Sequence, residues 1–287
     1  MAMPGWLNRS LVALALFAGL LVLATVVRRT SGEAVRPPLV GLPRTPDYHS
    51  LLVDEDDDRR LLLGTHAGLY ESRDGGRSWR IAGLEGQDVM SLIRVENGVL
   101  WATGHNVAAT SNDDGRTWED VRPRGLPTLD IHGFTRDGDG RLYAAVANEG
   151  LFRSEDEGRT FTLVSREVGP AAYGLAVRDA ELFAADAEKG LMESGDGGRT
   201  WRRALDARMT AVAVSPGAGR LLATGDATYL STDGGRRWRE VGGIPAKAWP
   251  VVWSPRDEKV AYVVTLPRDR KLYRSVDAGS SWEPVVD

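Results

Sequence analysis

The 287-residue chain contains no cysteine. Disulfide bonds, thiolate catalysis and zinc or iron–sulfur centres held by cysteine are therefore excluded. The chain also lacks a large excess of charge, because 36 Lys and Arg residues against 40 Asp and Glu residues leave a net charge of −4. A basic surface is the usual electrostatic signature of nucleic-acid binding, so we expect no nucleic-acid partner.

What the chain has in abundance points to repeated β-structure. Its 42% hydrophobic and 26% charged residues are typical of a globular protein, and its length suits one large domain or two small ones. It holds 33 glycines and 9 tryptophans. Glycine supplies tight turns and tryptophan packs between sheets, so this pairing predicts an all-β fold built from repeats.

One long apolar run stands near the N-terminus. Residues Leu11 to Val27 carry no charge and have arginines on both flanks. The run is at the short end of what spans a bilayer as a helix, and it exceeds the core of a typical signal peptide. We therefore expect residues 1–30 to form a membrane anchor, with a signal peptide cleaved after Ala24 as the alternative, and residues 31–46 to form a linker. The flanking charges leave the orientation open.

An octapeptide of the pattern Ser-x-Asp-x-Gly-x-x-aromatic occurs six times after this segment. The copies are SRDGGRSW (72–79), SNDDGRTW (111–118), SEDEGRTF (154–161), SGDGGRTW (194–201), STDGGRRW (231–238) and SVDAGSSW (275–282). Their aspartates are Asp74, Asp113, Asp156, Asp196, Asp233 and Asp277. One motif at a near-constant spacing of about 40 residues indicates a repeat architecture.

Each repeat predicts the same four strands. An apolar segment such as HSLLV comes first, and a turn rich in Gly or Asp leads to a second segment such as RLYAAV. A third strand enters the octapeptide, and a fourth leaves it at the aromatic residue. Four strands in about 40 residues match one blade of a β-propeller, so we predict a six-bladed β-propeller over residues 47–287. We expect the segment near Leu39 to Pro43 to close the ring as an outer strand of the sixth blade.

The repeat resembles the Asp-box, or BNR repeat, of sialidases, sortilin-type receptors and the photosystem II assembly and stability factor. The segments GTHAGLYESRDGG and DIHGF are similar to those of secreted or anchored bacterial Asp-box proteins labelled glycosyl hydrolases. In this family the motif lies in the turn between the third and fourth strands of a blade. Aspartate can accept hydrogen bonds across such a turn, glycine allows positive φ and the aromatic residue fills the space between blades. We therefore assign the six aspartates a structural role.

The resemblance also implies a function. A propeller beside a membrane segment, without a recognisable catalytic set, suits a membrane-tethered scaffold in the periplasm or at the cell surface that binds or helps to assemble a protein partner. The alternative is a glycoside hydrolase-like enzyme acting on an extracellular glycan. A sialidase is disfavoured, because the chain lacks the Arg-Ile-Pro signature of that family.

Propellers place ligands at the mouth opposite the octapeptide turns. There the loops between second and third strands lie, and the first strands begin. Counting back from each octapeptide aspartate assigns polar side chains to both places. The loop candidates are His66, His105, Asn148, Glu188, Asp226 and Asp269, and the candidates at the start of first strands are His49, Asp88 and His132. All four histidines of the chain thus fall at one mouth.

The functional interpretation of these histidines is a ligand or divalent metal site. Imidazoles would donate nitrogen, and Asp88 or Glu188 a carboxylate. In the alternative interpretation, each histidine hydrogen-bonds a neighbouring blade or lines a wet channel. The chain has no HExxH or other closely spaced metal motif, and no other cofactor is predicted.

Carboxylates provide the residues for the enzyme alternative. A glycosidase needs two of them about 5 to 10 Å apart. The candidates are Asp88, Glu188, Asp226 and Asp269. Two further acidic segments, 54–58 and 137–140, fall between first and second strands, where we expect solvated turns rather than calcium loops.

Overall fold

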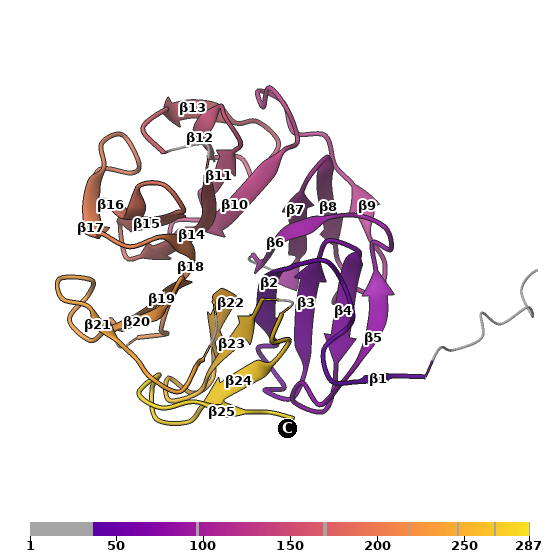
Figure 1. Ribbon diagram of the computed structural model, residues 1–287. Coiled ribbons are helices and arrows are strands. Elements are labelled where there is room, and N and C mark those ends of the chain that lie inside the picture. The colour runs from indigo at the N-terminus through magenta and orange to yellow at the C-terminus, as the bar shows by residue number, and fades with distance from the viewer. Residues whose placement is uncertain are drawn as a thin grey trace, which may run out of the picture. The chain divides into compact units, whose positions relative to one another are not determined.

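The computed structural model describes residues 37–286 except 96, 97, 169, 170, 218, 246 and 267. The anchor or signal peptide expected over residues 1–30 lies outside this part of the chain. In the described residues no helix has the length and apolar character needed to cross a membrane. The described strands of residues 38–287 form six antiparallel sheets, which are the six blades (Figure 1).

The first three blades are each made of four consecutive strands. Blade 1 has β2 (Tyr48–Val53), β3 (Leu61–Thr65), β4 (Gly68–Ser72) and β5 (Ser78–Gly83); blade 2 has β6 (Val89–Arg94), β7 (Leu100–Gly104), β8 (Val107–Ser111) and β9 (Glu119–Asp120); blade 3 has β10 (Ile131–Arg136), β11 (Leu142–Val146), β12 (Gly150–Ser154) and β13 (Thr162–Ser165). The second strand of each is buried along its whole length. Neighbouring blades cover both of its faces, so it has no alternation of polar and apolar residues.

The last three blades repeat this order. Blade 4 has β14 (Ala172–Arg178), β15 (Glu181–Asp186), β16 (Gly190–Ser194) and β17 (Arg202–Leu205); blade 5 has β18 (Met209–Val214), β19 (Leu221–Gly225), β20 (Thr228–Ser231) and β21 (Arg239–Glu240); blade 6 has β22 (Ala248–Trp253), β23 (Ala261–Thr265), β24 (Leu272–Ser275) and β25 (Glu283–Pro284). The outermost strands are short, and those of blades 2, 5 and 6 are fully exposed. Short, charged edges of this kind oppose pairing with other chains.

The first strand of every blade faces the centre of the ring. The innermost strands contact one another in the order β2, β6, β10, β14, β18 and β22, and β22 contacts β2 again. Figure 1 shows the blades following one another around this centre from indigo to yellow. The predicted six-bladed propeller is confirmed.

The ring is closed differently from the prediction. β1 (Leu39–Val40) pairs with β5, the outermost strand of blade 1, and not with blade 6. Blade 6 already has its fourth strand in β25, so this segment has no place there. Side chains join the two blades instead, because Ser254 Oγ donates to Asp58 Oδ1 (2.7 Å) and Arg256 Nη1 donates to the carbonyl oxygen of Asp56 (2.6 Å).

The six octapeptide turns share one hydrogen-bond pattern. In blade 4, Ser194 Oγ donates to Asp196 Oδ1 (2.8 Å), and the backbone N–H of Thr200 donates to the same oxygen (3.0 Å). The backbone N–H of Gly198 donates in turn to Ser194 Oγ (2.9 Å). The equivalent bonds occur in the other five copies. Each aspartate thus ties together the two sides of its turn.

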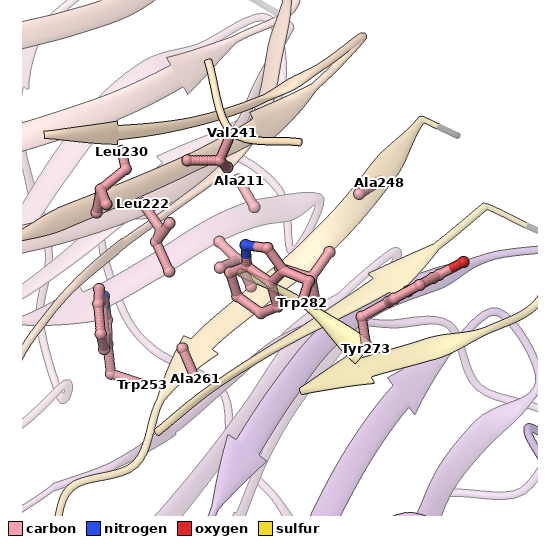
Figure 2. Close-up of a cluster of buried hydrophobic side chains, with 11 residues drawn as sticks. Ala211, Leu222, Leu230, Val241, Ala248, Trp253, Ala261, Tyr273 and Trp282 are labelled. Atoms are coloured by element: carbon pink, nitrogen blue, oxygen red, sulfur yellow. The ribbon is translucent and has the colours of Figure 1, made fainter. Parts of the chain in front are cut away.

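The aromatic residue that ends each octapeptide packs against the preceding blade. Trp79 of blade 1 shares a buried cluster with Tyr262 of blade 6. Trp282 of blade 6 lies in the cluster with Leu222 of blade 5, as Figure 2 shows. The aromatic residues of blades 2 to 5 join the clusters at the other four interfaces. This packing is what the repeat predicted for the space between blades.

The glycine within the turn makes this close approach possible. Gly198 has a φ of 88°, and a Cβ at this position would lie 2.3 Å from Leu151 Cδ2 of blade 3. A side chain there would be strained, and the Leu151 side chain would have to move to admit it.

The two acidic segments are turns between first and second strands, as predicted, and only the first aspartate of each is buried. Asp54 is buried, and its carboxylate accepts hydrogen bonds from Arg60 Nη1 (2.6 Å) and Arg94 Nη2 (3.2 Å). Asp137 is also buried and accepts from the backbone N–H of Arg141 (2.9 Å) and from the Tyr143 hydroxyl (3.1 Å). The first aspartate of each segment therefore fixes its turn to the blade.

Candidate functional site

Every innermost strand begins with a β-bulge at the mouth. The pairing with the second strand shifts directly after the first residue of β2, β6, β10, β14, β18 and β22. The residues at this position are His49, Met90, His132, Tyr173, Thr210 and Trp249. A bulge inserts one extra residue and re-aims its side chain, so the repeat presents one variable side chain per blade at the same place.

Four of these side chains are in contact across the mouth. The His132 ring stacks on Tyr173, with centroids 5.1 Å apart and planes at 9°. Tyr173 meets Trp249 edge to face at 5.0 Å, and Trp249 meets His49 in the same way at 4.9 Å. Rings from blades 3, 4, 6 and 1 thus form a continuous aromatic arc.

Asp88 completes this arc on the side of blade 2. This buried carboxylate precedes β6 and accepts a hydrogen bond from His105 Nδ1 on Oδ2 (2.7 Å). His66 Nδ1 lies 2.8 Å from the same oxygen, and His49 Nε2 lies 3.1 Å from Oδ1. The contact between His49 Nε2 and Asp88 Oδ1 is not aligned as a hydrogen bond. Both atoms are therefore buried without a hydrogen-bond partner among the described residues. Three imidazoles therefore surround one carboxylate.

A second cluster lies beside the first and includes a residue that the sequence did not suggest. His105 Nε2 is 3.0 Å from His132 Nε2. Asp130, which precedes β10, places Oδ1 at 3.1 Å from His132 Nε2 and 3.3 Å from His105 Nε2. His105 belongs to both clusters, so the structure brings all four histidines of the described chain together.

Two pKa values reflect this environment. Burial opposes ionisation of Asp88, but the surrounding histidines outweigh it and lower the pKa of the carboxyl below its usual value. Burial lowers the pKa of His132, and Asp130 acts in the opposite direction without reversing the shift. At neutral pH these shifts favour an ionised Asp88 and an uncharged His132.

Two hollows adjoin the clusters. A groove of about 510 Å³ runs along blade 2 and is lined by His66, Asp88, His105 and Arg122, among others. A cavity of about 360 Å³ follows the ring centre below the aromatic arc and is lined by inner strands, with His49, Tyr173 and Trp249 at the mouth. His66 and His105 therefore line the first hollow, and His49 lines the second.

Charge is divided around the mouth. The residues that precede the six innermost strands are Asp47, Asp88, Asp130, Ala171, Arg208 and Lys247. Blades 1 to 3 thus contribute acids, whereas blades 5 and 6 contribute bases, and both bases are exposed.

The other predicted loop residues do not join the histidines. Asn148 and Glu188 are exposed in their loops, one position beyond the residue equivalent to His66. Asp226 forms an ion pair with Lys247 (2.6 Å), and Asp269 accepts a hydrogen bond from Thr265 Oγ1 (3.0 Å) within its own hairpin. The mouth positions that sequence reasoning missed are Asp130, Met90, Tyr173 and Thr210, and for Trp249 the sequence left core packing and a sugar-binding platform open. The sequence signal for these positions is their place at, or directly before, the start of a first strand.

No protein-family model matches the chain, and no curated protein matches it. Solved structures do. A GH74 xyloglucanase from Xanthomonas campestris has a TM-score of 0.57 at 20% identity, over 86% of this chain and 47% of that one. YCF48 bound to a D1 peptide has a TM-score of 0.54 at 19% identity, over 88% of this chain and 85% of that one.

A third solved structure is the extracellular domain of a one-component system from B. thetaiotaomicron. Its TM-score is 0.56 at 17% identity, over 79% of this chain and 32% of that one. The chain therefore spans less than half of the xyloglucanase and of this domain, but most of YCF48. These likenesses establish the β-propeller fold of the chain, and the fold alone.

Proposed function

We propose that this chain is an extracytoplasmic binding module, tethered by residues 1–30, that holds a segment of a protein partner at the propeller mouth. The observation that carries the proposal is the division of charge around the mouth, from Asp47 and Asp130 on one side to Arg208 on the other, where Lys247 is paired with Asp226. A surface of this kind selects the orientation of a partner that carries both charges. We assign the octapeptides to the Asp-box (BNR) repeat as part of the same proposal.

Two solved propellers of the same fold support this function. One of them is YCF48 bound to a D1 peptide, and another is an extracellular domain. The groove beside the histidines is open to solvent along blade 2, which suits an extended segment.

A glycoside hydrolase-like activity is the alternative, in line with the fold of the xyloglucanase. The contacts of the candidate carboxylates favour the hydrolase less than the binding module. Asp88 lies among histidines, Asp226 faces Lys247, and Asp269 is bonded to Thr265. An acid and a nucleophile or base need to face a shared substrate position, and these three carboxylates are each engaged within their own surroundings, whereas Glu188, the fourth candidate, is exposed in its loop.

We expect charge reversal at the mouth to abolish capture of the partner. The full chain and the double variant Arg208→Glu, Lys247→Glu would be used as bait on detergent-solubilised membranes, and the captured proteins compared by mass spectrometry. The matched control is Arg236→Glu, an exposed arginine in the octapeptide turn of blade 5 on the opposite face. A protein captured by the wild type and the control but not by the double variant is the expected result.

Equal capture by all three baits would contradict the proposal. So would hydrolysis of xyloglucan by the purified chain that is lost in Asp226→Asn or Asp269→Asn, because that result would identify the enzyme alternative.

A further inference from the structure

We propose that His105 Nε2, His132 Nε2 and Asp130 Oδ1 bind one divalent first-row transition-metal ion at the mouth of the propeller. The three atoms come from the loop after β7 and from the start of β10. This site goes beyond the proposed binding of a protein partner and does not depend on it.

The distances between the three atoms fit a common ion. They are 3.0 Å between the two nitrogens, 3.1 Å from Asp130 to His132 and 3.3 Å from Asp130 to His105. Ligand atoms about 2.1 Å from one ion lie about 3.0 Å apart at octahedral angles and about 3.4 Å apart at tetrahedral angles. All three distances fall within this range.

The hydrogen bond between His105 and Asp88 also orients the His105 ring towards the site. Ionised Asp88 only accepts hydrogen bonds, so the Nδ1 atom of His105 carries the proton that it donates to Asp88 Oδ2. Nε2 of the His105 ring then faces His132 Nε2 (3.0 Å) and the carboxylate of Asp130 (3.3 Å). Three potential ligand atoms therefore converge on one position at the mouth.

The surroundings hold these atoms in place before an ion arrives. The backbone of Asp130 forms bridges with Gly104 and His105, and its N–H donates to Thr128 Oγ1 (2.8 Å). His132 is 8% exposed and stacked on Tyr173, so its ring plane is fixed. Its Nε2 faces His105 Nε2 and Asp130 Oδ1, while its Nδ1 has no hydrogen-bond partner among the described residues.

Asp88 acts as a positioning residue for this site. A carboxylate that accepts from the second nitrogen of a ligating histidine fixes the tautomer and orients the ring. The other cluster, formed by His49, His66 and Asp88, is a weaker candidate. Its two short contacts end on different carboxylate oxygens, and Asp88 Oδ2 already accepts from His105.

The donor set indicates the class of ion. Imidazole nitrogens with one carboxylate suit Zn²⁺, Ni²⁺, Cu²⁺ or Fe²⁺, whereas Mg²⁺ and Ca²⁺ prefer oxygen ligands. The side chains of His105 and Asp130 are 45% and 39% exposed, and the open groove adjoins them. Three protein ligands with access to solvent leave at least one coordination position for water or for a side chain of a bound molecule.

The test uses the full chain, purified in detergent without an affinity tag and treated with a chelator. Titration with Zn²⁺ in a calorimeter is expected to give one ion per chain and a higher melting temperature. His105→Gln and Asp130→Asn should each weaken binding at least about 100-fold, and Asp88→Asn about 10- to 100-fold. Both ligand positions are partly exposed, so these variants should keep the metal-free melting temperature of the wild type.

Two further variants make the assignment specific. Glu188→Gln removes an exposed carboxylate from another mouth loop and should leave Zn²⁺ affinity unchanged. His66→Gln changes the residue of blade 1 that is equivalent to His105 and should weaken binding far less than His105→Gln. Absence of Zn²⁺ binding by the wild type, or loss in His66→Gln equal to that in His105→Gln, would overturn the proposed triad.

Discussion

We expect Trp79→Ala to lower the free energy of unfolding by about 3 to 5 kcal/mol, the usual cost of removing a fully buried aromatic side chain. Trp79 is 0% exposed and lies among side chains of blades 1 and 6, where the ring closes. Its Nε1 donates to the carbonyl oxygen of Gly76 (3.0 Å), so the ring also covers its own octapeptide turn. Removal leaves a cavity at the interface that is held without a shared strand. Urea denaturation of the purified chain would measure the loss.

Trp201→Ala is the matched comparison. Trp201 ends the octapeptide of blade 4 and makes the same bond to Gly198 (3.0 Å), but it is only half-buried. We expect a clearly smaller loss of stability there, because less surface returns to water. If Trp79→Ala lowers the free energy of unfolding no more than Trp201→Ala does, the buried cluster between blades 1 and 6 does not stabilise the ring more than the other interfaces do.

We also expect the propeller to lose stability steeply in acid. A hydrogen bond from the Thr117 side chain is the main cause that lowers the pKa of Asp113 to about 2. Ser281 has the same effect on Asp277, whose pKa is also about 2. The pKa of an aspartate in the unfolded chain is about 3.9. Each turn therefore contributes stability that is present above about pH 4 and is lost as the pH falls towards 2. The losses from six turns add together.

Melting temperatures measured across this pH range would test the effect, with Asp113→Asn as the control. Asparagine keeps one acceptor oxygen for the turn but cannot titrate. The variant should therefore melt at a lower temperature than the wild type at neutral pH and should lose less stability on acidification. A wild-type melting temperature that stays constant down to about pH 2 would contradict the role assigned to the octapeptide carboxylates.

The sequence was informative about the blades because their pattern is local. Each octapeptide contains both ends of its hydrogen-bonded turn, as Ser194 and Asp196 show, so the residues that specify it are adjacent in the chain. The site residues were harder to predict from the sequence because the loops that carry them differ in length. Two residues separate β3 from β4, three separate β11 from β12, and six separate β23 from β24. Counting back a fixed number therefore reaches the first loop residue at His66 but the second at Asn148.

The contacts between blades could not be predicted from the repeat either. Asp130 meets His105 only because two loops of different blades bridge, and Tyr173 reaches Trp249 across the centre of the ring. Neither contact has a spacing that a repeat could reveal. The bulges share a position in every blade, but their residues differ from blade to blade. The repeat therefore predicts where these side chains lie in the fold but not what they bind.

The closure of the ring has a consequence for how the chain can be cut. Each blade comes from one continuous stretch of sequence, and blade 6 takes no strand from the N-terminal segment. The described connections from the last strand of one blade to the first strand of the next contain between three and ten residues. A linker of similar length from blade 6 to blade 1, with new termini between any other two blades, would give a circular permutant that keeps every blade intact. The blade that a ribosome makes first could thus be any of the six, while the cyclic order of the blades around the ring stays the same.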